Sequence, residues 1–223
     1  MTLRYFPTVF DASDLPSAKA IILTDEGPGA DPKTRWELET PYVMELIDSQ
    51  LALGERMHVL DYGCGIGRLA KAIIETFGCN VIGLDLSPKM RSLAVEYVKD
   101  ERFLAVSPAQ FDGLVDAGLK VDRTISIWVL QHCFAPAKDI ARMNRSLAPG
   151  GRGFVLNMNK RAVPAVQDAV VQGNTAFRWV HDGIDVAALL RNELNIDVEG
   201  VPDRGRTPNM ADAGAFWMTF RRL

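Results

Sequence analysis

The chain contains few of the residues that build metal centres and disulfide frameworks, and it has no long apolar run. Its 223 residues include 3 cysteines and 3 histidines. Cys64, Cys79 and Cys133 are odd in number and lie far apart, which fits neither a disulfide framework nor the close-paired spacing of a zinc site. Nowhere do about 18 apolar residues run together, and no basic N-terminal stretch leads into an apolar one. We therefore expect a cytoplasmic protein without a metal ion or a membrane segment.

Charge of either sign is in no large excess. Lys and Arg number 25 against 28 Asp and Glu, for a formal net charge of -3. Without a global positive field to gather phosphates, nucleic acid is not expected as a partner, although a local basic patch stays possible. A hydrophobic content of 48% allows a substantial core, and the length suits one domain with additions. No pattern indicates the oligomeric state.

We expect the first part of the chain to form an arm followed by short helices. Residues 1–32 mix Pro, Gly and Asp without a sustained period, so we expect an irregular arm. Asp31 before Pro32 resembles an N-cap and first helical position, and Thr40 before Pro41 repeats the signal. These signals predict two short helices ending near Leu53. We divide the chain into residues 1–54 and a core domain of residues 55–223.

Beyond residue 55, apolar runs rich in Val, Ile and Leu alternate with segments at helical spacing. This alternation is typical of repeated βα units that build a parallel sheet, so the fold class is α/β. The predicted strands are 57–62, 79–85, 102–106, 122–130 and 151–157. The predicted helices between them are 67–77, 88–99, 109–117 and 136–147. In the tail we expect helices at 162–172 and 184–194, then strands at 195–201 and 214–222.

A glycine-rich turn between a strand and a helix is the strongest motif. Residues 58–70 read HVLDYGCGIGRLA, with glycines at alternate positions. Glycines at such a turn let a ligand lie directly against the main chain. Twenty residues beyond Gly65, Asp85 ends the second predicted strand, where a carboxylate can accept hydrogen bonds from two ribose hydroxyls. The loop and the distant acid together predict a nucleoside site.

Asp61 helps to choose between two nucleoside cofactors. The loop also satisfies the dinucleotide fingerprint in its Gly/Ala form. Asp61, however, would set a carboxylate beside a pyrophosphate, an unfavourable pairing of like charges. It suits the sulfonium and ammonium of S-adenosylmethionine. The alternative role for Asp61 is a strand-end residue bonded to local backbone.

Four segments resemble the motifs of class I S-adenosylmethionine-dependent methyltransferases, in order and spacing. Residues 59–67 (VLDYGCGIG) look like the first motif, and 83–90 (GLDLSPKM) are similar to the segment that binds ribose and borders adenine. Residues 129–132 (VLQH) and 147–151 (LAPGG) resemble the end of the fourth strand and the turn before the fifth. The resemblance implies a Rossmann-like, seven-stranded, mostly parallel sheet with helices on both faces. It also implies a last strand that is antiparallel and inserted beside the fifth.

The resemblance further implies the cofactor, S-adenosyl-L-methionine, and the residues that bind it. It makes Gly63, Cys64 and Gly65 a main-chain cradle for the methionine part, with Asp61 near the ammonium. Asp85 would hold the ribose, and Leu86 and Met90 would flank the adenine, although Met90 could equally be plain core. Trp128 would form the floor beside the methyl group, or belong to the core. Arg35, with Trp36 and Tyr42, would close the pocket as an N-terminal lid and pair with the methionine carboxylate; an exposed arginine would instead face solvent.

One position departs from the family pattern. The family often has an acidic residue after the third strand for the adenine amino group, whereas residues 106–111 read VSPAQF. Pro108 also lacks an N–H. Ser107 or Gln110 could serve instead, or packing alone could hold the adenine.

His132 is the candidate catalytic base. It follows the fourth predicted strand, and an imidazole can take a proton near neutral pH. Methyl transfer can also proceed by alignment in a dry pocket without a base, which would leave His132 as a hydrogen-bonded structural residue. His181 is a weaker candidate, on a predicted loop. The residues around 160–185 are expected to help frame the acceptor pocket.

The resulting prediction is an S-adenosylmethionine-dependent methyltransferase. Its acceptor would be small or medium-sized, since no long basic segment suggests RNA. The motifs do not specify the acceptor or the atom methylated. A non-catalytic cofactor-binding module and an NAD(P)-dependent oxidoreductase are the alternatives, although no Ser/Tyr-x-x-x-Lys constellation supports the second.

Overall fold

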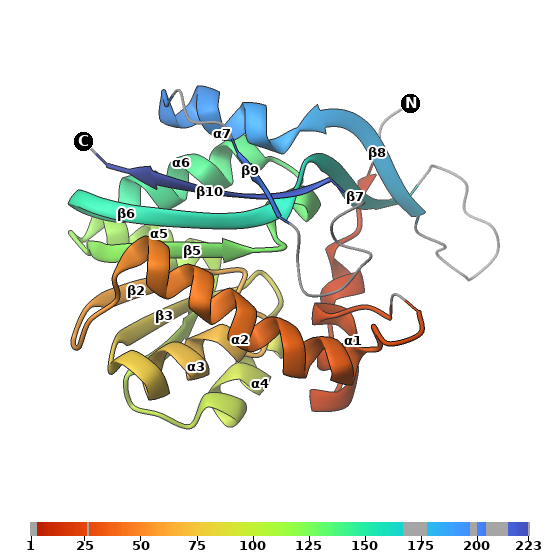
Figure 1. Ribbon diagram of the computed structural model, residues 1–223, viewed down its shortest axis with the longest axis horizontal. Coiled ribbons are helices and arrows are strands. Elements are labelled where there is room, and N and C mark those ends of the chain that lie inside the picture. Colours follow the sequence, from red (N-terminus) through yellow and green to blue (C-terminus); the bar gives the residue numbers. More distant parts are fainter. Residues whose placement is uncertain (1–3, 26, 167–177, 197–199, 204–213, 223) are drawn as a thin grey trace.

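A mostly parallel sheet with helices on both faces forms the centre of the molecule (Figure 1). The computed structural model describes residues 4–25, 27–166, 178–196, 200–203 and 214–222. The seven-stranded sheet has the order β4-β3-β2-β5-β6-β10-β9. Its strands are β2 (His58–Tyr62), β3 (Asn80–Leu84), β4 (Phe103–Val106), β5 (Val121–Ile127), β6 (Leu147–Met158), β9 (Val201–Pro202) and β10 (Ala215–Arg221). Strands β2 to β6 pair in parallel, whereas β10 is antiparallel to β6, so the predicted fold class and inserted last strand are confirmed.

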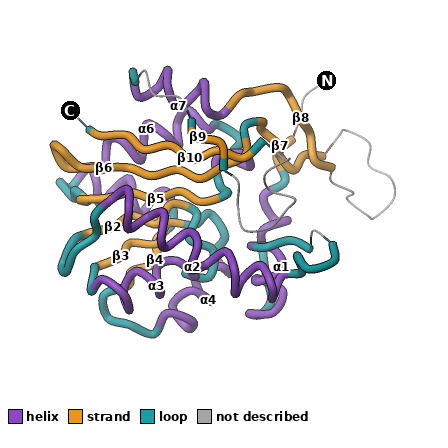
Figure 2. The backbone as a smooth tube through the Cα atoms, in the orientation of Figure 1, coloured by secondary structure: helices purple, strands orange, loops and turns teal. Residues whose placement is uncertain are grey.

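Two layers of helices cover the sheet, as Figure 2 shows in purple. The helices α2 (Pro32–Leu51), α3 (Arg68–Phe77) and α4 (Pro88–Val98) bury residues against one face. The helices α5 (Pro108–Asp116), α6 (Pro136–Ser146) and α7 (Val186–Leu194) bury residues against the other. The strands β2, β3 and β5 bury apolar side chains on both faces, as parallel sheets require, and Asp61, Thr124 and Ser126 are buried polar exceptions. No helix within the described ranges is long and apolar enough to cross a membrane.

The helix α2 corrects the prediction of two short helices. It runs continuously from Pro32 to Leu51 with Pro41 in its interior. A proline removes one helical hydrogen bond, but the Thr40 hydroxyl donates to the Trp36 carbonyl oxygen at 2.7 Å beside the gap. Val43, Ile47 and Leu51 are buried on one side of α2, so packing outweighs the local break.

The N-terminal arm is more regular than its composition indicated. After β1 (Arg4–Tyr5) and the short η1 (Pro7–Phe10), the helix α1 covers Leu15–Ile22. Asp14 caps it by accepting from the Ser17 N–H at 2.8 Å, and the Ser17 side chain completes a capping box. The expectation of an irregular arm was wrong here, because it gave the turn-forming residues more weight than this capping signal.

A second sheet of three strands, ordered β1-β7-β8, joins the arm to the region after β6. Strand β7 (Lys160–Val166) pairs antiparallel with β1 and with β8 (Arg178–Asp185). The helix predicted at 162–172 is therefore wrong for 162–166, and its remainder lies outside the described residues. Val163 and Pro164 disfavour a helix, and short apolar runs do not distinguish the two structures. Of the strand predicted at 195–201, residues 197–199 lie outside the description and only Val201 belongs to β9.

Candidate functional site

A large cavity opens at the carboxyl ends of β2, β3 and β5, where α/β sheets bind ligands. Its volume is about 920 Å³, and its walls come from the N-terminal arm, the glycine loop, the end of β3, η2 (Leu130–His132) and β8. It opens beside the sheet β1-β7-β8, which lies at the end of the molecule that carries the N-terminus (Figure 1).

The glycine loop supplies space and carbonyl groups more than hydrogen-bond donors. Gly63 and Gly65 have positive φ values of 78° and 53°. A Cβ on Gly63 would lie 2.3 Å from the nearest methyl carbon of Val129, so no larger residue fits without displacement. The N–H groups of Gly63 and Cys64 donate to the Leu84 carbonyl oxygen at 2.7 and 3.0 Å. These two amides are therefore already bonded, and the main-chain cradle stays a prediction.

Cys64 itself faces away from the large cavity. Its thiol is buried behind the loop, 2.8 Å from where a Cβ on Gly83 would stand, and burial raises the pKa of this thiol well above its ordinary value. Cys64 lines a small neighbouring cavity of about 30 Å³, so its contribution to the large one is limited to its backbone.

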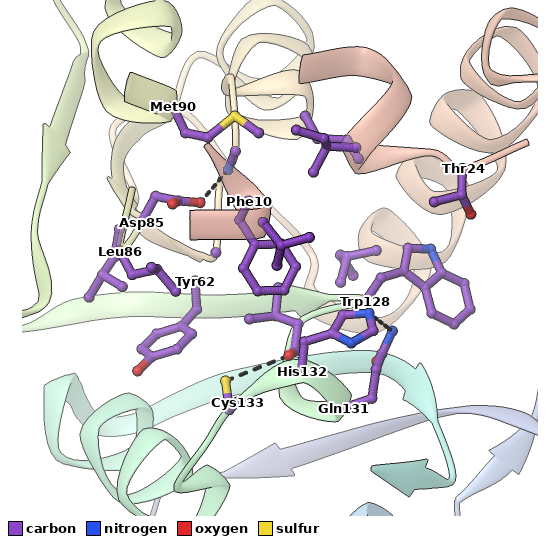
Figure 3. A pocket seen from close by; sticks show the side chains of 18 of the residues that line it. Phe10, Thr24, Tyr62, Asp85, Leu86, Met90, Trp128, Gln131, His132 and Cys133 are labelled. Carbon is purple, nitrogen blue, oxygen red and sulfur yellow. Dashed lines mark hydrogen bonds between the residues drawn. The ribbon is translucent and has the colours of Figure 1, made fainter. Parts of the chain in front are cut away.

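Asp85 is held rigidly at the edge of the cavity. Its Oδ2 accepts from the Gly65 N–H at 2.9 Å, as Figure 3 shows, and its Oδ1 accepts from the Ser87 N–H at 2.8 Å. Burial raises the pKa of this carboxyl to about 6, against the effect of those two hydrogen bonds. Each oxygen keeps lone-pair capacity for two neighbouring hydroxyls. Leu86 and Met90 lie on the same side of the cavity (Figure 3).

Asp61 lies beneath the loop in a buried cluster of charges. Only 3% of Asp61 is exposed, and its Oδ2 has no hydrogen-bond partner among the described residues. Burial raises the pKa of this carboxyl to about 7, partly offset by Arg68. Asp61 lines the small cavity, whose walls at Gly63 and Arg68 also belong to the large one. An unpartnered buried carboxylate is a costly group that a cationic ligand would satisfy.

The three residues assigned to an N-terminal lid separate in the structure. Arg35 lines the large cavity, with its Nε 2.6 Å from Glu39 Oε1 and its Nη1 2.8 Å from the Thr24 carbonyl oxygen, so it is buried and not a solvent-facing arginine. Trp36 instead lies outside the cavity lining, where Arg68 stands 5.5 Å from its ring centroid. The Tyr42 hydroxyl bonds to Asp203, also away from the lining. The expectation that Trp36 and Tyr42 close the pocket is therefore wrong.

His132 faces the cavity with a defined tautomer. Its Nδ1 lies 2.8 Å from the Ala162 carbonyl oxygen, which can only accept, so Nδ1 carries the proton. Its Nε2 lies 3.3 Å from the Gln131 amide nitrogen, which can only donate, so the single lone pair of Nε2 accepts this hydrogen bond (Figure 3). Burial lowers the pKa of His132 below its ordinary value. The imidazole is therefore neutral near pH 7.

Aromatic rings surround this imidazole. The ring centroids of Trp179 and Phe10 lie 4.9 and 5.8 Å from that of His132. Trp128 also lines the cavity and adopts a left-handed φ of 61°, unusual for its type, with its Nε1 buried and unpartnered in the described structure. Sequence reasoning missed Phe10 and Trp179, because neither belongs to a motif. His181, by contrast, is exposed on β8 and does not line the cavity.

The loop after β4 offers no free side chain to a ligand. Ser107 and Gln110 bond to each other's backbone in a capping box at the start of α5, at 3.3 and 2.9 Å. Pro108 lines the cavity but has no N–H.

Taken together, these residues fit an adenosyl cofactor with a charged amino-acid end. The glycine loop leaves space that a Cβ would fill, Asp85 offers two held oxygens to a ribose, and Asp61 lacks a partner that an ammonium could supply.

Comparison with known families points the same way. Residues 59–151 match the methyltransferase domain family. The chain is 28% identical over 179 residues to a ubiquinone biosynthesis O-methyltransferase of Methylococcus capsulatus, covering 75% of this chain and 74% of that protein. It is 32% identical over 104 residues to phosphoethanolamine N-methyltransferase 2 of Caenorhabditis elegans, covering 46% of this chain and 24% of that protein. It spans about half the length of several other ubiquinone biosynthesis O-methyltransferases that it matches.

Solved structures share the fold over most of the chain. The [4+2]-cyclase SpnF superposes with a TM-score of 0.58 at 18% identity, covering 88% of this chain and 85% of that one. The putative methyltransferase crystallised with the Haloferax volcanii activator Trm112 gives a TM-score of 0.56 at 18% identity, covering 84% and 91%. At this identity the likeness concerns the fold alone.

Proposed function

The chain belongs to the class I S-adenosylmethionine-dependent methyltransferases, and from that premise we propose that it methylates a hydroxyl oxygen of a small aromatic acceptor. The observation that carries this proposal is the neutral His132 imidazole in the lining of an aromatic cavity, whose unprotonated Nε2 accepts from the Gln131 amide.

The cofactor would lie along the carboxyl edge of the sheet. Asp85 would bind the ribose hydroxyls, and Leu86 and Met90 would border the adenine. The carbonyl groups of the glycine loop and Asp61 would face the ammonium, and Arg35 the carboxylate. Trp128 would form the floor beside the sulfur. These roles suit the positions of the side chains around the cavities and the charges that they carry. Residues 1–54 would form a segment of their own that covers the cofactor site. The proposed location of the protein is the cytoplasm.

A base is needed when the acceptor atom carries a proton that must leave. When bound, S-adenosylmethionine supplies a methyl group activated by its sulfonium. His132 would take the hydroxyl proton at Nε2 once the acceptor hydroxyl replaces the Gln131 amide as the donor to that atom, while the Ala162 carbonyl oxygen, 2.8 Å from Nδ1, stabilises the imidazolium that forms. A cofactor and an acceptor that fill the cavity would displace water from the imidazole, which would strengthen this electrostatic effect.

The walls around His132 favour an uncharged, planar acceptor. Phe10 and Trp179 stand 6.2 Å apart by ring centroids and both neighbour the imidazole, so an aromatic ring could stack between these groups and the cofactor. The relative from Methylococcus capsulatus is an O-methyltransferase by name, which agrees with this choice.

Phosphoethanolamine, the substrate in the name of the other relative, suits the cavity less well. A phosphate needs cationic partners. The cationic side chains among the described lining residues are Arg35 and Arg68. Arg35 is paired with Glu39 and is assigned to the carboxylate of the cofactor, and Arg68 is buried beside Asp61.

The test uses purified protein, S-adenosylmethionine and a panel of phenols, catechols and phosphoethanolamine, with methyl transfer followed by mass spectrometry. We expect turnover with an aromatic hydroxyl compound, and a loss of kcat of about 10²-fold or more in His132→Ala, the usual range for a general base. His181→Ala is the matched control, because His181 is exposed away from the cavity. Unchanged kcat in His132→Ala, with native circular dichroism, would refute the base role. Turnover of phosphoethanolamine alone would refute the acceptor class.

A further inference from the structure

The adenine amino group needs an acceptor that the loop after β4 does not provide. The side chains of Ser107 and Gln110 each accept from the other residue's backbone N–H, and the side chain of Pro108 is a ring without a hydrogen-bonding atom. An exocyclic amino group left without a partner in a buried site would weaken cofactor binding. Another acceptor at that end of the cavity is therefore required if adenine is to be distinguished from other purines.

One carboxylate from the opposite helix layer reaches the same cavity. Asp139, in the first turn of α6, lines it together with Leu86 and Pro108. Its position is fixed by Tyr62, whose hydroxyl donates to Asp139 Oδ1 at 2.6 Å. Figure 3 shows Tyr62 beside Leu86, at the side of the cavity away from Trp128. Asp139 therefore lies at the end where Leu86 would border the adenine.

The surroundings of Asp139 fix the position of its side chain. Arg142 Nη1 donates to the same Oδ1 at 3.0 Å, and the guanidinium is anchored on its other side by both oxygens of Asp112. The side chain of Asp139 is 19% exposed. Two hydrogen bonds meet on Oδ1, the Cys133 thiol also bonds to Asp139, and a carboxylate can accept about four hydrogen bonds. Asp139 thus keeps capacity for a donor that enters from the cavity.

We propose that Asp139 accepts a hydrogen bond from the amino group of the cofactor's adenine, replacing the acidic residue that the loop after β4 lacks. Asp139 would determine specificity for the cofactor. It lies on α6, whereas the acidic residue of the family pattern follows the third parallel strand. Tyr62 and Arg142 are its positioning residues. This assignment does not depend on which acceptor is methylated.

Calorimetry with two product analogues tests the proposal without any turnover. The first ligand is S-adenosylhomocysteine, and the second is its purine analogue, in which hydrogen replaces the amino group. The wild-type protein is expected to bind the first about tenfold or more tightly, since a hydrogen bond to a charged acceptor is lost with the second. Equal affinities for the two ligands would overturn the proposal.

Three variants assign the discrimination to its residue. In Asp139→Ala the two affinities should become equal to within about twofold, and Asp139→Asn, which keeps a neutral acceptor, should fall between. Asp116→Ala is the matched control, because it removes a carboxylate of α5 whose ion pair is with Arg145 and leaves Arg142 and Asp139 in place. It should keep the tenfold ratio. Ser107→Ala tests the rival acceptor and should keep it too.

The ratio of affinities separates recognition from stability. A purely structural Asp139 would weaken both ligands equally in Asp139→Ala. That result, or an equal loss of the ratio in Asp116→Ala, would overturn the proposal. If Asp139→Ala does not fold, a ratio of affinities in Asp139→Asn equal to that of the wild-type protein would overturn the proposal. Failure of the wild-type protein to bind either ligand would instead refute the cofactor assignment, and loss of methyl transfer alone would concern only the proposed acceptor.

Discussion

The Nδ1 atom of His132 lies 2.8 Å from the carbonyl oxygen of Ala162, thirty residues later in the chain. The contact links the loop after β5 to strand β7, and so ties the proposed base to the sheet that closes the cavity. A carbonyl at that position fixes one tautomer, the one that leaves Nε2 unprotonated.

The pH dependence of kcat/KM follows from the burial of this imidazole. Burial disfavours the imidazolium and lowers the pKa of His132 below 6.5, so the neutral base persists to more acid pH than in a free histidine. With saturating S-adenosylmethionine, so that the titration of Asp61 does not limit cofactor binding, we expect kcat/KM for the acceptor to be level near pH 7 and to fall by about tenfold per pH unit only below pH 6.5. The profile should be measured for the wild-type enzyme and for His181→Ala, which should match it. An acid limb centred above pH 6.5, or one that survives in His132→Ala, contradicts the assignment.

Asp85→Ala should weaken cofactor binding by about 1.5–3 kcal/mol, because hydrogen bonds to a charged acceptor are lost from the ribose. The measurement is calorimetry with S-adenosylhomocysteine on folded protein. Asp122→Ala serves as control, since Asp122 also accepts from a backbone N–H, that of His58 at 2.8 Å, but lies outside the cavity lining. An unaltered affinity in Asp85→Ala would make Asp85 a structural cap of the glycine loop.

The sheet and the cofactor side of the site were predictable from local signals. The glycines of residues 59–67 indicate the turn. Asp85 follows that turn at a fixed distance in the sequence because a βα unit has a limited length. Each of these features depends on residues close together in the sequence.

The acceptor side was not predictable in the same way. Phe10 and Trp179 reach His132 through pairing between β1, β7 and β8, which joins positions more than 150 residues apart. Asp139 looked like an ordinary acidic residue in the first turn of a helix. Only the packing of α6 against the sheet reveals that it reaches the cavity. Tertiary contacts of this kind leave no periodic or spacing signal in a single sequence.

Two glycine replacements should have opposite effects on stability. Gly63→Ala would place a Cβ 2.3 Å from a Val129 methyl at a φ of 78°, so the free energy of unfolding should fall by about 2 kcal/mol or more. Gly113 lies within α5 with nothing within 4 Å of its added Cβ. Gly113→Ala should therefore raise the free energy of unfolding by about 0.5–1 kcal/mol. Urea denaturation checks both, and an unaffected Gly63→Ala would contradict the tight fit of the loop.

Cofactor binding should release a proton from Asp61. Burial raises the pKa of this carboxyl to about 7, so at pH 6 it is mostly protonated in the free protein. An ammonium brought beside it favours the carboxylate and lowers that pKa, so the proton must leave. At pH 6 we expect S-adenosylhomocysteine to release about 0.5–1 proton, and at pH 8.5 almost none, since Asp61 is then already ionised. Affinity should accordingly rise from pH 6 to pH 8 and then level off.

The number of protons comes from the dependence of the calorimetric enthalpy on the ionisation enthalpy of the buffer. Two controls isolate Asp61 from Asp85, whose raised pKa of about 6 lets ribose binding release a smaller fraction. Asp61→Asn removes the titrating group but preserves its shape. 5′-Methylthioadenosine retains the ribose and adenine but has no ammonium. Both should show only the small Asp85 contribution. If methylthioadenosine releases as many protons as S-adenosylhomocysteine, the ammonium does not bind beside Asp61, and the unpartnered Oδ2 must be satisfied in another way.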